Sequence, residues 1–256
     1  MTGRYTGLGR VAAVVALVGA LVTAAAVPGR PHAGDTRTWL AEPANLDRVK
    51  REISRYYGGH VDDGGHHHAT QDSPWARRVA ELVGQARAYL AARLAARVRQ
   101  PAIVLDIDDT SEQTYDWSAD RDFAFDAAAQ RQAIADAAFP PVEPTRELAN
   151  WASQHGVRVF FVTGRAEELA GSTAAGLRVH GFPEPAGLFL RPTRTPRPYL
   201  PCGLSCDTVA YKSGTRAFLE AQGNTIVLNL GDQDSDLAGG HAERAVKLPN
   251  PMYTIP

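Results

Sequence analysis

One pattern constrains the fold of this chain more than any other: short apolar segments alternate with helical ones after Pro101. The apolar segments are AIVLDI, VRVFFVT, GLFLR, TIVLNLG and AVKLP, at residues 102–107, 157–163, 187–191, 225–231 and 245–249. The helical patterns between them are TRELANWASQHG, EELAGSTAAGLRVHG and KSGTRAFLEAQG. Continuously apolar strands that alternate with helices predict an α/β fold, with a parallel sheet and helices on both of its faces.

Polar groups follow three of these strands at the carboxyl end, where such sheets place their chemistry. They are Asp106, Asp108 and Asp109 after the first strand, Thr163, Gly164 and Arg165 after the second, and Asp232, Asp234 and Asp236 after the fourth. Carboxylates from two strand ends repel one another in one crevice unless a cation lies among them. All-oxygen ligation suits a hard ion such as Mg²⁺, whereas softer metals favour His or Cys. The pattern therefore predicts a site for a hard cation and a phosphate.

These motifs resemble, in identity and order, those of the haloacid dehalogenase superfamily of phosphohydrolases. The matching motifs are D-x-D-x-T at 106–110, Thr163, Lys212 within AYKSGTR, and G-D-x-x-x-D at 231–236. DIDDT, FFVTGR, LFLRP, GDQDSDL and KLPNPMYTIP are further similar to the class B-like secreted acid phosphatases, a group that includes the plant vegetative storage proteins. The resemblance implies a Rossmann-like sheet with a small cap after the first motif.

The resemblance also implies the roles of the two catalytic carboxylates. Asp106 would attack phosphorus and form an aspartyl-phosphate, which divides one hard step into two. Asp108 would protonate the leaving oxygen and later accept a proton from the attacking water. Their spacing of two residues places both side chains on one side of an extended segment.

A second set of roles follows from the same resemblance. Phosphate would be bound by Thr163, Gly164 and Lys212. Mg²⁺ would be bound by Asp106, the carbonyl of Asp108, Asp232 and, through water, Asp236. Position 234 is Asp where many relatives have Trp, which adds negative charge near this predicted metal site.

We therefore expect a secreted, Mg²⁺-dependent acid phosphatase that hydrolyses phosphate monoesters. Two alternatives stay open: a phosphonate or halide hydrolase of the same superfamily, and a non-catalytic secreted storage or binding protein. Asp108 argues against dehalogenation because a departing halide needs no proton, and Asp106 argues against the non-catalytic alternative. The net charge of −1 gives no basic surface for nucleic acid.

The segment 111–144 is too short for a large cap domain, which predicts an open site. Tyr115 and Trp117 are the predicted contacts of the leaving group, and stacking on one of them would favour nucleoside monophosphates. Phe123 and Phe125 are expected to pack the cap onto the core instead.

The first residues have the build of a secretory signal peptide, predicted at 1–26. An apolar run extends from Val11 to Val27 after a basic start, and Ala24–Ala26 supply small residues for cleavage. If this segment is not cleaved, it would anchor the protein in a membrane. A flexible leader at 27–45 is expected to follow.

The rest of the chain is predicted as an N-terminal helical segment at 46–100 and a phosphatase core at 101–256. The first part should hold one short helix at 46–57 and one long helix that starts at Ser73-Pro74 and ends at Gln100-Pro101.

Three further features lie outside the motifs. The His-rich stretch at 60–68 is expected to be a solvated loop, with adventitious metal binding as the alternative. Cys202 and Cys206 are close enough to form a disulfide, which export would favour. Arg165 and Arg191 are expected to make structural pairs rather than to contact substrate.

Overall fold

The computed structural model describes residues 42–255. The predicted signal peptide and all but the end of the predicted leader lie outside these residues. From Ala44 onward the chain forms one compact unit. In the described part of the chain, no helix combines the length and the hydropathy that a membrane span needs.

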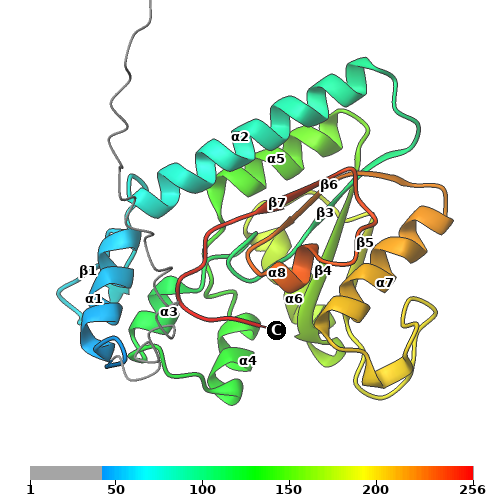
Figure 1. Ribbon diagram of the computed structural model, residues 1–256. Coiled ribbons are helices and arrows are strands. Elements are labelled where there is room, and N and C mark those ends of the chain that lie inside the picture. Colours follow the sequence, from blue (N-terminus) through cyan, green and yellow to red (C-terminus); the bar gives the residue numbers. More distant parts are fainter. Residues whose placement is uncertain (1–41, 256) are drawn as a thin grey trace, which may run out of the picture. The chain divides into compact units, whose positions relative to one another are not determined.

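The centre of this unit is a parallel sheet of five strands, which confirms the predicted fold class (Figure 1). The strands are β3 (Pro101–Leu105), β4 (Arg158–Ala166), β5 (Gly187–Arg191), β6 (Thr225–Gly231) and β7 (Arg244–Lys247). Their order is β5-β4-β3-β6-β7, so the chain moves outward from β3 in one direction and then returns to its other side. Such a reversal opens a crevice at the carboxyl ends of the central strands.

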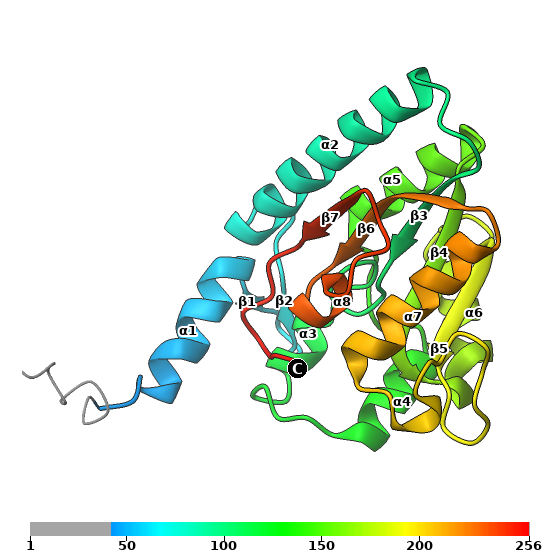
Figure 2. The ribbon, with the colours of Figure 1, turned by 45° about the vertical axis from the view of Figure 1, so that its right-hand side comes forward.

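Helices cover both faces of the sheet, and alternate residues of β3 contact different helices. Ile103 and Leu105 belong to the core formed with α2 (Pro74–Ala95), α5 (Glu143–Gln154) and α6 (Ala170–Val179). Ala102 and Val104 belong to a second core, formed with α7 (Thr208–Ala221). Figure 2 shows α2 and α5 side by side, with α7 across the sheet from them. Because both faces are buried, the strands are apolar throughout rather than alternating.

The N-terminal helix α1 (Leu46–Tyr57) occupies its predicted range, from an Asn45 cap to Gly58 in the left-handed conformation. Its last residue, Tyr57, stacks between two rings: the centroid distance is 5.0 Å to Trp75 of α2 and 4.5 Å to Tyr115. Tyr115 opens helix α3 (Tyr115–Ala119), which follows the first motif. This three-ring stack joins α1, α2 and α3 in one core.

The His-rich stretch differs from the predicted loop, because it contains the antiparallel strands β1 (His60–Val61) and β2 (His67–His68). Asp62 shapes the turn between them by accepting the backbone N–H groups of Gly64 and His66. Ring nitrogens of His66 and His67 each lie 3.0 Å from Asp120. The imidazoles therefore pair with carboxylates, which connects this hairpin to the end of α3.

Helix α2 begins at Pro74 with Ser73 as its cap, as predicted, but it ends at Ala95 rather than at Gln100. Left-handed backbone at Arg97 (φ 57°) and Gln100 (φ 44°) reverses the chain before β3. The segment 111–144, predicted as the cap, contains α3 and a further helix, α4 (Ala127–Ala135). The remaining elements are the short helices η2 (Glu167–Leu169), η3 (Gly203–Ser205) and α8 (Asp234–Leu237).

Candidate active site

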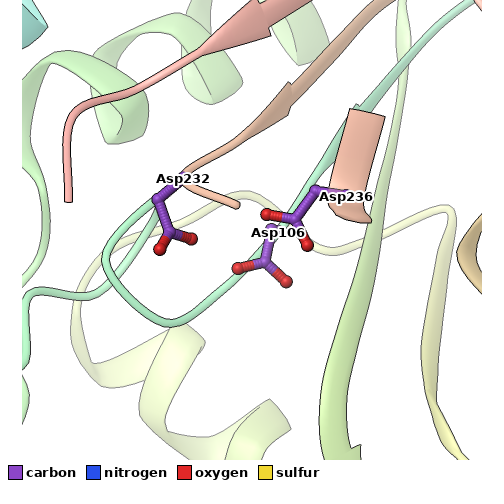
Figure 3. Close-up of side chains that lie close together, drawn as sticks. All are labelled: Asp106, Asp232 and Asp236. Atoms are coloured by element: carbon purple, nitrogen blue, oxygen red, sulfur yellow. The ribbon is translucent and has the colours of Figure 1, made fainter. Parts of the chain in front are cut away.

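Three buried carboxyl groups meet where β3 and β6 end. Asp106 directly follows β3, Asp232 directly follows β6, and Asp236 lies in α8 (Figure 3). One oxygen from each lies within 4.8 Å of the others, the spacing that a single metal ion could bridge. The convergence inferred from the strand ends is thus present in the fold.

Lys212 of α7 brings a positive charge to this cluster. Its ammonium donates hydrogen bonds to Asp106 and Asp236. Burial raises the pKa of Asp106 well above its usual range, against the attraction of Lys212, and Asp236 and Asp232 raise it further. Burial lowers the pKa of Lys212, but Asp106 and Asp236 more than offset this, so its pKa is raised overall. Three carboxyl groups around one ammonium leave an excess of negative charge, which suits a hard cation.

Asp108 lies apart from this cluster and pairs with Arg165. The Nη2 of Arg165 lies 2.7 Å from Asp108 Oδ1 and 2.7 Å from Glu112 Oε2. Nδ1 of His180, at the end of α6, is 2.8 Å from the other oxygen of Glu112. Burial lowers the pKa of Arg165, but Asp108 and Glu112 outweigh it and raise the pKa overall. Asp106 and Asp108 therefore have distinct surroundings, as different roles require.

Asp109 is a structural residue at the edge of the site. It is fully buried with a positive φ of 56°, and its carboxyl accepts hydrogen bonds from the Thr114 backbone and the Tyr253 hydroxyl. Burial, with Asp232 nearby, raises its pKa to about 7. Asp234, by contrast, is exposed.

The predicted phosphate residues differ in their exposure. Gly164 is exposed and lines a cleft of about 230 Å³ together with Asp106, Asp108 and Lys212. Thr163 is buried and is not among the cleft-lining residues; its hydroxyl accepts a hydrogen bond from the Arg165 backbone N–H. A phosphate contact for Thr163 stays a prediction.

A second cavity, of about 330 Å³, adjoins the cleft on the side of α3. Asp108, Phe125 and Tyr253 line both cavities, and Trp117 and Phe123 line the second. Phe125 is 72% exposed, so the expectation that it packs the cap onto the core is wrong.

The prediction for Tyr115 is also wrong. Its ring is 0% exposed, stacks on Tyr57 and lines neither cavity. Its hydroxyl donates a hydrogen bond to Ser54 of α1. Trp117, two residues further along α3, does line the second cavity, since a shift of two positions on a helix turns the side chain toward another side.

Cys202 and Cys206 are joined by a disulfide in the loop before α7. Arg191 lines the cleft and donates a hydrogen bond to the Cys206 carbonyl. Arg191 thus makes a structural pair while facing the cleft, and so does Arg165.

Comparison with known proteins identifies the family to which this chain belongs. The model of the HAD superfamily, subfamily IIIB (acid phosphatase), matches residues 67–256. The chain belongs to this family.

Individual relatives match shorter stretches. The stem 28 kDa glycoprotein of Glycine max is 34% identical over 45% of this chain and 44% of its own length. Acid phosphatase 1 of Solanum lycopersicum is 31% identical over 59% of this chain and 58% of its own. Vegetative storage protein 1 of Arabidopsis thaliana is 31% identical over 46% of this chain and 40% of its own length. The chain thus spans about half the length of the curated relatives it matches.

The class C acid phosphatase from Bacillus anthracis shares the fold. Its structure superposes with a TM-score of 0.60 over 82% of this chain and 86% of that chain, at 17% identity. At this identity the likeness concerns the fold alone.

Sequence reasoning missed several residues around the site, namely Glu112, His180, Gln233, Asn250 and Tyr253. Glu112 and His180 stand in none of the motifs, whereas Gln233 lies within GDQDSDL and Asn250 and Tyr253 lie within KLPNPMYTIP, at positions to which those motifs assign no role. Their contacts appear only when distant segments fold together.

Proposed function

We propose that this protein is a secreted, Mg²⁺-dependent acid phosphatase that hydrolyses phosphate monoesters through an aspartyl-phosphate. The observation that carries the proposal is the meeting of Asp106, Asp232 and Asp236 with Lys212 in a cleft that Asp108 also lines. Membership of an acid phosphatase family supports the same reaction.

The carboxyl cluster fits a magnesium ion. Asp106, Asp232 and Asp236, with the carbonyl of Asp108, would hold it, because these oxygen donors are those that Mg²⁺ prefers. When bound, the ion would offset the repulsion among the carboxylates and draw charge from the phosphoryl oxygens.

In the first step, a carboxylate oxygen of Asp106 attacks phosphorus and the bond from phosphorus to the ester oxygen breaks. Asp108 gives its proton to that oxygen, and the alcohol leaves. This assignment is supported by the position of Asp108, which lines both the cleft and the second cavity. Arg165 fixes the carboxyl of Asp108 in this position.

In the second step, water attacks the aspartyl-phosphate and Asp108 takes its proton. The bond between phosphorus and the Asp106 oxygen breaks and inorganic phosphate leaves. Lys212, which is buried beside Asp106 and lines the cleft, stabilises the negative charge that accumulates on the phosphoryl group. We assign the binding of other phosphate oxygens to Gly164 and Thr163.

The second cavity would receive the leaving group. Its aromatic lining, with Trp117 and the exposed ring of Phe125, favours flat leaving groups such as nucleosides. Replacement of either residue by Ala should narrow the difference in kcat/KM between a nucleoside monophosphate and glycerol phosphate. Tyr115→Phe is a matched control, because that ring lines neither cavity. An unchanged difference in both Ala variants would reject the stacking.

Hydrolysis of p-nitrophenyl phosphate by the exported protein, with Mg²⁺ and with a chelator, tests the proposal. Asp106→Asn should lose turnover by on the order of 10⁴-fold or more while the protein stays folded. Asp234→Asn removes an exposed carboxylate close in sequence to the cluster and should keep wild-type turnover. Absence of turnover in the wild type would favour a storage role, as the name of the Arabidopsis relative suggests.

The proposal that the protein is secreted depends on the predicted signal peptide at 1–26 and can be tested separately. Sequencing the N-terminus of the exported protein should place the first residue after Ala26. A protein that keeps these residues and stays with the membrane fraction would contradict cleavage.

A further inference from the structure

The segment Pro249–Ile255, which we call the strap, follows β7 and borders the active site (the end of the red ribbon in Figure 1). It is attached at both ends. The indole N–H of Trp75 donates to the Pro249 carbonyl at 2.9 Å, and the Ser235 hydroxyl donates to the Ile255 carbonyl at 2.8 Å. The strap is therefore held in a defined position by α2 and α8.

Besides the bond from Tyr253 to Asp109, the strap determines hydrogen bonds to the carboxyl group of Asp232. Oδ2 of Asp232 accepts from the side-chain amide of Asn250 at 2.7 Å and from that of Gln233 at 2.5 Å. The strap also sets Gln233, whose Oε1 accepts the backbone N–H of Ile255 at 2.9 Å. Oδ1 accepts only the longer bond from the Thr110 hydroxyl, at 3.2 Å, among its contacts in the described structure.

Two amide donors on the same oxygen fix the rotation of a carboxylate, because turning the group would break both bonds at once. They also occupy Oδ2, which leaves Oδ1 as the freer ligand oxygen. Groups that orient a metal ligand in this way contribute strongly to metal affinity.

We infer that Asn250 is a positioning residue that orients Asp232 for metal binding, and that the strap is thus a working part of the metal site. The inference rests on the proposed function, since it takes the carboxyl cluster to be a Mg²⁺ site. It assigns Asn250 no contact with substrate or metal.

Asn250 also has a purely structural contact, which an experiment must separate from the first. Its Oδ1 accepts the Met252 backbone N–H at 2.8 Å, closing a turn within the strap. A serine hydroxyl can close the same kind of turn. Its shorter side chain does not reach Asp232. Asn250→Ser therefore keeps the turn and removes the amide donor.

The test is calorimetric titration of Mg²⁺ into the metal-stripped, full-length protein, together with thermal unfolding in EDTA. Asn250→Ser should raise the Kd for Mg²⁺ by about 10- to 100-fold. Its Tm in EDTA should stay near the wild-type value. The matched control is Asn224→Ala, which removes a buried amide at the opposite end of β6, where it bonds Leu219 and Arg158. This control should lower the Tm and leave the Kd unchanged.

The possible outcomes separate this inference from the proposed function. If the wild type binds Mg²⁺ and Asn250→Ser binds it equally well, the positioning role is overturned and the phosphatase proposal stands. If Asn224→Ala weakens binding as much as Asn250→Ser, the effect is general destabilisation and the inference also fails. A wild type that binds no Mg²⁺ overturns the metal assignment and the inference with it.

Discussion

Replacement of Glu112 by Gln should destabilise the protein, and more so in acid than in alkali. Glu112 is buried and carries two partners, Arg165 at 2.7 Å and His180 at 2.8 Å. Loss of its charge leaves Arg165 with Asp108 as its remaining carboxylate. Breaking a buried ion pair costs about 3–5 kcal/mol. Because Asp108 stays in place and Gln can still accept a hydrogen bond, we expect the lower end, about 3 kcal/mol, at pH 8.

The pH dependence comes from His180. The hydrogen bond to Glu112 raises the pKa of His180 above 6.5, although partial burial opposes this. A raised pKa means that the stabilisation is fully present below pH 6.5 and is lost as the pH rises through the folded-state pKa. At pH 5 the wild type therefore has the additional Glu112–His180 attraction, worth about 1 kcal/mol. Glu112→Gln should be destabilised by about 4 kcal/mol there.

Urea unfolding of the wild type and of Glu112→Gln, in EDTA at pH 5 and at pH 8, measures the loss in the free energy of unfolding at each pH. His180→Gln is the matched variant: it should be destabilised at pH 5 and close to wild type at pH 8. Equal losses for Glu112→Gln at the two pH values would refute the assignment of His180 as the titrating partner. A loss below about 1 kcal/mol at pH 8 would refute the buried ion pair as a source of stability.

Three further predictions concern the site. Asp108→Asn should lower kcat/KM by about 10²- to 10⁴-fold for alkyl phosphates and by less for nitrophenyl phosphate, whose leaving group needs little protonation; equal losses would count against a general acid. Chelation should abolish activity, and Asp232→Ala should raise the Mg²⁺ concentration needed to restore it by at least about tenfold, whereas full activity in excess EDTA would exclude the metal site. Mass spectrometry of the unreduced protein should show Cys202 joined to Cys206, and replacing both by Ser should cost about 2 kcal/mol, with a larger effect on KM than on kcat; free thiols in the unreduced protein would contradict the bridge.

The sequence alone predicts the parallel sheet, because strands that are buried on both faces have a recognisable local pattern. Each strand is an uninterrupted apolar run, and the charged residues that follow these runs must meet at one edge of a parallel sheet. This rule predicts that Asp106, Asp232 and Asp236 lie together, although the numbers of Asp106 and Asp232 differ by 126 (232 − 106).

The residues that hydrogen-bond the carboxyl groups of the site from distant segments have no such local pattern in the sequence. Tyr253 donates to Asp109 across 144 positions, and Asn250 looks like an ordinary loop residue until the strap folds back. Nearness in sequence was also a poor guide to the site, because Tyr115 lies close to Asp106 in the sequence but its ring stacks on Tyr57. Side-chain direction on a short helix depends on packing partners that the local sequence does not contain.

The three-ring stack has a consequence for how the boundaries of this protein are drawn. The region recognised by the family model begins at residue 67, after α1, whereas the compact unit begins at Ala44. A shortened protein that starts at the family boundary would lack Tyr57 and leave Trp75 and Tyr115 without the ring between them. Tyr115 begins the helix that carries Trp117, so the loss would extend to the second cavity, which Trp117 lines. The smallest piece worth producing for crystallisation or directed evolution therefore starts before α1, and variation within α1 belongs in any library that aims to change substrate preference.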